Sequence, residues 1–116
     1  MSLLRRRLWC ATRYSLRGLG ACLRHEEAFR VEVALAALLL PLAFLLGRSG
    51  AERALLGGVV LLVLVVELIN SALEAVVDRQ GGEPSELAAR AKDQGSAAVF
   101  LSMLAVLLVW AAVLLD

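Results

Sequence analysis

The sequence predicts an all-α membrane protein, composed of an amphipathic surface helix followed by three transmembrane helices. Apolar residues make up 60% of the 116 positions, against roughly 45 to 50% in an ordinary soluble domain. Three long apolar runs follow one another, and a chain this short buries only about two thirds of its surface, so it could not hide them in its own core. Seven of the 12 basic residues lie within the first 30 positions, which indicates a surface segment before the spans.

The predicted surface helix occupies residues 1–29. From Leu8 to Phe29, apolar residues recur at helical spacing with arginines between them, a pattern typical of a helix that lies in the membrane interface. A helix packed on protein is the alternative, and the two are compatible in an oligomer. The basic block leads straight into apolar segments and holds few aromatic residues, so it indicates a membrane surface and not a nucleic acid. Its arginines also interrupt the apolar stretch that a cleaved export signal needs.

The three predicted spans are residues 30–46, 54–77 and 95–115. The apolar run from Val33 to Leu46 has only 14 residues, and the span becomes long enough when it is counted from Ala28. Pro41 is expected to kink this helix. After the second span, Ser85 is a candidate N-cap for a short polar helix. The third span opens with small residues that would let helices approach closely.

The basic residues predict how the spans are oriented. Three spans place the amino-terminal segment and the loop after the second span on one side of the membrane. That side carries ten basic residues, against Arg48 and Arg53 on the other, so it is expected to face the cytoplasm, where ATP is available. The sequence shows one domain and no internal repeat. Cys10 and Cys22 lie 12 positions apart, too far along a helix for a disulfide, and are expected to be free thiols.

A polar stripe crosses the cytoplasmic half of the second span. Glu67, Asn70, Glu74 and Asp78 are separated by three, four and four positions, which places them on one helix face. An ionisable residue inside a membrane costs at least about 2.5 kcal/mol and therefore usually faces a cavity or a partner. A structural seam between helices would leave these charges unpaired, because the stripe holds no basic residue. The stripe therefore predicts a functional site.

Unpaired carboxylates at a membrane face favour Mg²⁺, which binds through a few carboxylates together with waters and substrate phosphates. Glu26 or Glu27, at the end of the surface helix, could add a carboxylate. Lys92 and Asp93 add a cation and another acid just before the third span. The glycine-rich phosphate loop and the His-Arg-Asp set of protein kinases are absent. His25, the single histidine, is weak support for a zinc site.

Three segments resemble the bacterial integral-membrane diacylglycerol kinase family. They are EEAFR at Glu26 to Arg30, ELINSALEAVVDR at Glu67 to Arg79, and AKDQGSAAV at Ala91 to Val99. The likeness extends over nearly the whole chain. Three positions depart from it: Pro84 and Ser85 stand where the family has an aromatic residue and a histidine, and Gln94 stands where it has a methionine.

The resemblance implies a domain-swapped homotrimer in a bacterial inner (cytoplasmic) membrane, with active sites shared between subunits. It also implies transfer of the γ-phosphate of ATP, with Mg²⁺, to the primary hydroxyl of diacylglycerol. Glu67 would then be the general base, organised by Asn70, and Glu26 and Glu74 would hold the metal. The resemblance places eight residues at the nucleotide: Arg7, Tyr14, Glu26, Glu74, Glu83, Ser85, Lys92 and Asp93. It places three along the lipid: Arg53, Glu67 and Ser96.

Three other functions are weighed against this one. An undecaprenol kinase belongs to the same family, but the segment from Gly95 to Ala98 is more similar to the diacylglycerol kinases of Gram-negative bacteria. A small proton-coupled transporter typically needs four spans and an acid near the middle of the membrane. A purely structural scaffold has no use for Lys92 and Asp93 beside the carboxylates.

Overall fold

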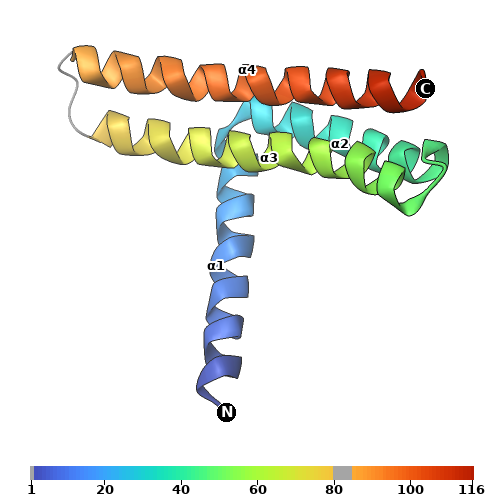
Figure 1. Cartoon of the computed structure of the whole chain (residues 1–116). Helices are drawn as coiled ribbons and strands as arrows, with labels where there is room; N and C mark the ends of the chain where they lie inside the picture. The colour runs from blue at the N-terminus through green and yellow to red at the C-terminus, as the bar shows by residue number, and fades with distance from the viewer. Residues whose placement is uncertain (1, 80–84) are drawn as a thin grey trace.

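The computed structural model describes residues 2–79 and 85–116 and contains four helices in this part of the chain (Figure 1). They are α1 (Leu3–His25), α2 (Glu27–Leu46), α3 (Gly50–Arg79) and α4 (Glu86–Leu114). The last three are long and apolar enough to cross a membrane. The predicted all-α architecture with three candidate spans is therefore confirmed.

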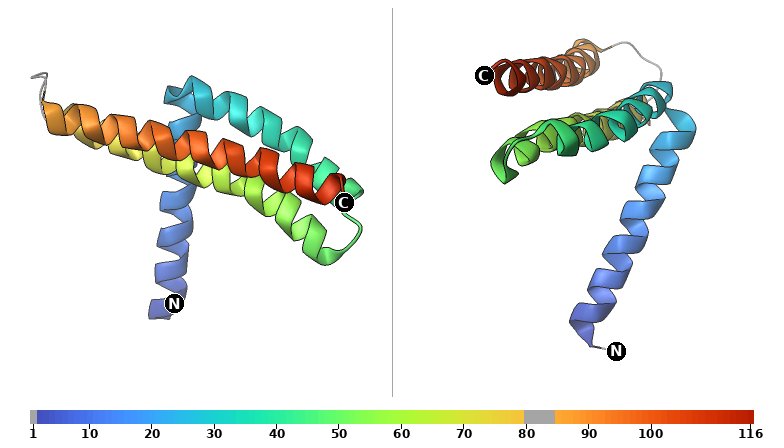
Figure 2. Two further views of the ribbon diagram at one scale, coloured as in Figure 1. Left: turned by 45° about the horizontal axis from the view of Figure 1, so that its top comes forward. Right: turned by 90° about the vertical axis from the view of Figure 1, so that its right-hand side faces the viewer.

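Helices α2, α3 and α4 run alongside one another, whereas α1 leaves this bundle sideways (Figures 1 and 2). Helix α3 lies at the centre and packs against both α2 and α4. Helix α1 meets the bundle only near its C-terminal end, where Cys22 is its one buried residue among those described. When the three spans cross a bilayer, this geometry lays α1 along the membrane surface, as expected of an interfacial helix.

The corner between α1 and α2 is fixed by Arg30. The chain leaves α1 at Glu26, whose backbone is extended (φ −116°, ψ 109°), and enters α2 at the next residue. The Arg30 guanidinium donates hydrogen bonds to the carbonyls of Leu23 (2.9 Å) and Arg24 (3.1 Å). These carbonyls lack partners inside α1, and a cation suits the negative end of the helix dipole. The corner determines where the Glu26 side chain points.

The packed core lies between the apolar halves of the spans. Ala36, Val59 and Val60 form its buried centre, and Trp110 packs against them from α4. The Trp110 indole N–H donates to the Leu56 carbonyl at 3.1 Å, so this residue joins α4 to α3 and is more than the membrane anchor its position suggests. Most other large apolar side chains face outward, which suits lipid or neighbouring subunits.

All four helices differ from their predicted bounds: α1 ends at His25, α2 begins at Glu27, α3 extends at both ends to Gly50–Arg79, and α4 begins at Glu86. Ser85 is the N-cap of α4, since its hydroxyl accepts from the Ala88 N–H at 3.0 Å, as expected. The separate short polar helix is wrong, because one continuous helix runs from Glu86 to Leu114. No proline interrupts it, and Gly95 lies in close contact with α3 instead of ending the helix. Helix α2 likewise continues through Pro41 to Leu46.

Candidate functional site

The corner between α1 and α2 meets α3 at Ser71. The Ser71 hydroxyl donates to Glu26 Oε1 at 3.1 Å. The C-terminal end of α3 and the N-terminal end of α4 both extend past the corner where α2 begins (Figure 1). With α1 on the membrane surface, Glu74 and Asp78 lie on the water side of this corner. Glu67 lies one helical turn, about 6 Å, inside the membrane.

A cavity of about 470 Å³ opens between α1 and α3 at the corner. The carboxyl groups of Glu26, Glu74 and Asp78 border it, together with Cys22 and His25. Burial raises the pKa of the Cys22 thiol, and the negative charge of nearby Glu26 acts in the same direction. Three acids from two elements therefore share one space that is open to water, the arrangement that the spacing along α3 and the position of Glu26 predicted.

Asn70 connects the two ends of the acidic stripe. It is buried, and its amide N–H donates to Glu74 Oε1 at 3.3 Å. Its side-chain oxygen has no hydrogen-bond partner in the described part of the chain and lies against Gly95 of α4. A Cβ at Gly95 would overlap that oxygen. Because Gly95 has no side chain, α4 can pack closely against α3 beside Asn70.

Lys92 closes the outer end of the site. Its ammonium group lies 2.6 Å from the Asp78 carboxylate, and both side chains are exposed. The pair joins the end of α3 to the first turns of α4. Asp93 is exposed beside Lys92 and forms no ion pair with the residues that the structure describes. A cation and several acids thus meet at the water side, as expected for a site that receives phosphate groups.

A second buried acid, Glu32, lies with Glu67 at the inner end. The two side chains are 9% and 7% exposed, respectively, and their carboxyl groups lie next to each other. The sequence pattern assigned no role to Glu32. The signal was present in the helical spacing, because Phe29, Glu32, Ala36 and Ala43 form the buried face of α2.

Three predicted residues lie away from this cluster within one chain, and a fourth, Ser96, directly follows Gly95 beside the cluster. Tyr14 is exposed on α1, 12 positions or about 18 Å before Glu26, and Arg7 is farther still. Arg53 lies at the opposite end of α3 from the acids. There its guanidinium donates to the Phe44 carbonyl at 3.1 Å and stacks on the Phe44 ring. Ser96 is exposed on α4.

Two residues predicted to contact the nucleotide lie at the loop before α4. Glu83 is outside the described residues. Ser85 is described, and its hydroxyl is engaged in capping α4. The predicted nucleotide contacts of this loop therefore receive no support from the geometry.

The residues at the corner fit Mg²⁺ better than a transition metal. Within the described ranges, no three His, Cys, Asp or Glu side chains converge as metal ligands. Glu26 and Glu74 nevertheless border the same cavity, and Mg²⁺ commonly takes one or two carboxylates and completes its shell with waters and substrate phosphates. A structural zinc site would instead require four protein ligands.

Comparison with known proteins gives one consistent result. The prokaryotic diacylglycerol kinase family matches residues 13–114. A diacylglycerol kinase of Haemophilus influenzae is 51% identical over 104 residues, covering 90% of this chain and 88% of the relative. One of Pseudomonas aeruginosa is 50% identical over 111 residues, covering 96% and 90%. One of Escherichia coli K12 is 45% identical over 100 residues, covering 86% and 82%.

Proposed function

Since the chain belongs to the prokaryotic diacylglycerol kinase family, we propose that it transfers the γ-phosphoryl group of ATP to the primary hydroxyl of diacylglycerol. The products are phosphatidic acid and ADP. One observation supports this most directly: the polar face of α3 runs from buried Glu67 to exposed Asp78. A lipid hydroxyl can reach the inner end from the bilayer while ATP reaches the outer end from water.

Glu67 is the general base of the proposed reaction. It accepts the proton of the lipid hydroxyl as that oxygen forms its bond to the γ-phosphorus. The bond between the γ-phosphorus and the bridging oxygen breaks, and its electron pair leaves with ADP. A positioned base of this kind contributes roughly a hundredfold to ten-thousandfold in rate. Asn70, one turn away and bonded to Glu74, links the base to the nucleotide end of the site.

Glu26 and Glu74 are the proposed metal ligands. Ser71 holds Glu26 in place, and Asn70 does the same for Glu74. Bound there, Mg²⁺ would neutralise charge on the transferring phosphate. Lys92 supplies a second positive charge by exchanging Asp78 for a phosphate oxygen, since a surface ion pair such as this one is weak enough to open. Asp93 completes the outer edge of the nucleotide site.

A homotrimer explains how predicted site residues that lie far from the cavity of their own chain contribute to a site. Arg7 cannot reach the cavity of its own chain, because α1 leads away from the bundle (Figure 2) and Gly18, the first residue that borders the cavity, comes 11 positions later. The exposed apolar side chains of α1 and of the spans need lipid or protein partners. We therefore propose that neighbouring subunits, arranged as a domain-swapped trimer, supply these contacts. We also propose that the site faces the cytoplasm from the bacterial inner membrane, which the excess of basic residues on that side supports.

The proposal is tested by kinetics on detergent-solubilised protein with diacylglycerol in mixed micelles. Glu67→Gln should lower kcat by roughly a hundredfold to ten-thousandfold with little change in the affinity for Mg²⁺ and ATP. Glu26→Gln and Glu74→Gln should weaken the response to Mg²⁺, and added Mg²⁺ should restore part of the rate. Glu86→Gln, an exposed acid at the start of α4, is the matched control.

Two results would contradict the proposed function. Rescue of Glu67→Gln by Mg²⁺, with no rescue of Glu74→Gln, would show that the two roles are exchanged. Phosphorylation of undecaprenol in the same micelles, with diacylglycerol left unmodified, would assign the chain to the other lipid of the family.

A further inference from the structure

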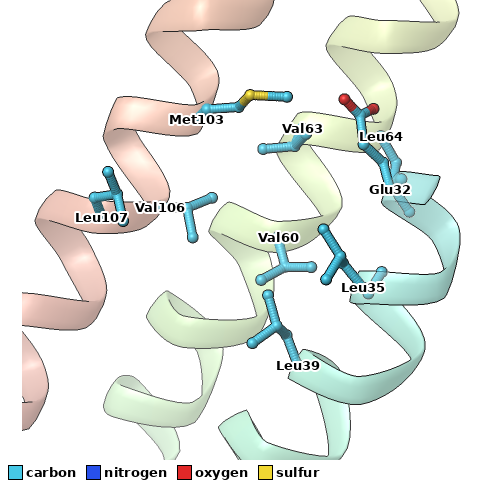
Figure 3. Close-up of a pocket in the computed structure, with 10 residues that line it drawn as sticks. Glu32, Leu35, Leu39, Val60, Val63, Leu64, Met103, Val106 and Leu107 are labelled. Carbon is cyan, nitrogen blue, oxygen red and sulfur yellow. The ribbon is translucent and has the colours of Figure 1, made fainter. Parts of the chain in front are cut away.

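Glu32 occupies the boundary between the polar site and an apolar pocket. This pocket, of about 250 Å³, lies between α2, α3 and α4, and Glu32 is the one charged residue among those that line it. Figure 3 shows the Glu32 carboxyl at one end of the pocket, directed towards α3 near Leu64. Leu64 lies one turn before Glu67 on α3. The rest of the lining is aliphatic or methionine, so no other polar side chain borders the pocket beside Glu32.

The partners of Glu32 define its chemistry. Glu67 is the charged group that acts on it, and the described ion pairs bring no Lys or Arg to either acid. Glu32 Oε2 has no donor from the described residues. Two adjacent carboxylates cannot both remain ionised in apolar surroundings, because their charges repel and neither is solvated. A single shared proton removes this conflict and supplies a hydrogen bond between them.

We propose that Glu32 is a positioning residue for Glu67: it carries the shared proton and donates it in a hydrogen bond to one Glu67 oxygen, which leaves the other oxygen free for the lipid hydroxyl. This inference rests on the proposed role of Glu67 as base. The assignment of the proton to Glu32 follows from the surroundings. Glu32 faces the apolar pocket, whereas Glu67 lies in line with the polar side chains of α3.

The hydrogen bond gives the base a fixed direction. A Glu side chain rotates about several bonds, and a base is effective only when its oxygen meets the reacting proton. Displacement of a reacting group by about 1 Å can cost a hundredfold in rate. Among the described residues no side chain hydrogen-bonds to Glu67, so the proposed proton on Glu32 supplies the donor that holds it.

Two substitutions of Glu32 separate positioning from packing. Glu32→Gln keeps an uncharged donor of the same shape, whereas Glu32→Met fills the volume without a donor. Glu32→Met should lower kcat about a hundredfold while the KM for ATP changes less than about twofold. Glu32→Gln should recover most of that loss. In the Glu67→Gln background, Glu32→Met should have little further effect, since the group it positions is already missing.

Infrared spectroscopy gives a readout independent of activity. Wild-type protein at neutral pH should show the carbonyl band of a protonated carboxylic acid, and Glu32→Gln should remove it. Glu26→Gln, which changes an acid at the water side, should leave that band in place. If Glu32→Met fails to fold, the carbonyl band of the wild type and of Glu32→Gln still shows whether Glu32 carries the proton.

Three outcomes would overturn the inference. Equal loss of kcat in Glu32→Gln and Glu32→Met would show that Glu32 acts as an ionised group. Full kcat in both would show that it has no part in positioning. Absence of the protonated-acid band would show that the pair does not hold the proton. If instead Glu67→Gln keeps wild-type kcat, the proposed base itself is wrong, which is a separate result.

Discussion

The Ser71 hydroxyl donates a hydrogen bond to Glu26 Oε1 at 3.1 Å and so joins two residues that are 45 positions apart. Glu26 lies at the corner between α1 and α2, where its extended backbone leaves it outside both helices. Without an anchor, its side chain would be free to rotate in the cavity. Ser71 fixes it on the side of the cavity that Glu74 also borders.

Ser71→Ala should therefore raise the Mg²⁺ concentration needed for half-maximal activity by about tenfold, the usual cost of removing a group that orients a metal ligand. Binding of Mn²⁺ in the presence of a non-hydrolysable ATP analogue, followed by electron paramagnetic resonance, should weaken in parallel. Ser102→Ala is the matched control, because the Ser102 hydroxyl bonds only to Val99 of its own helix. An equal effect in both variants would contradict the anchoring role of Ser71.

Gly95→Ala should lower both stability and activity. The added Cβ overlaps the Asn70 side chain, so α4 must move away from α3 or Asn70 must leave its position beside Glu74. Overpacking of this kind typically costs about 1 to 3 kcal/mol. Thermal unfolding in detergent and the kcat for ATP turnover measure the two effects. Gly58→Ala adds a Cβ where nothing lies within 4 Å and should retain the wild-type melting temperature or raise it; equal loss in both variants would count against the Asn70 contact.

Alkylation should distinguish the two cysteines. Cys10 is exposed and Cys22 is buried, and burial raises the pKa of the Cys22 thiol, so a smaller fraction is present as the reactive thiolate at pH 8. Iodoacetamide followed by mass spectrometry should modify Cys10 first and Cys22 much more slowly. Mg-ATP should slow Cys22 further, because this thiol borders the proposed nucleotide cavity. Equal rates for both cysteines would contradict the packing of α1 against α3.

Subunit mixing tests which residues share a site. Within one chain Glu26 bonds to Ser71, which lies one helical turn after Glu67 on α3. If one chain supplies both acids to a site, mixing Glu26→Gln with Glu67→Gln subunits should restore little activity. If Glu26 and Glu67 of one site came from different subunits, the same mixture would instead restore activity. Arg7→Gln and Glu74→Gln subunits should instead complement each other, if a neighbour's α1 supplies Arg7. Recovery in the first mixture and none in the second would contradict this division.

The helices and the acidic stripe were predictable because both depend on nearest neighbours along the chain. Hydropathy over about 20 residues indicates a span, and separations of three and four positions place side chains on one helix face. The same local reasoning separated α4 into a short polar helix and a span, since the residues just before Gly95 are polar and those after it are mostly apolar. Local patterns do not show that a glycine is packed against another helix.

The sequence alone determined the number of spans, the polar face from Glu67 to Asp78 and the family to which the chain belongs. Only the tertiary structure decided that Ser71 meets Glu26, that Gly95 packs against Asn70, and that Glu32 lies beside Glu67. These relationships join different helices, and the distance between such residues depends on how far each helix is shifted and rotated against its neighbour. That register is set by the packing of many side chains together and is not contained in the periodicity of any one segment.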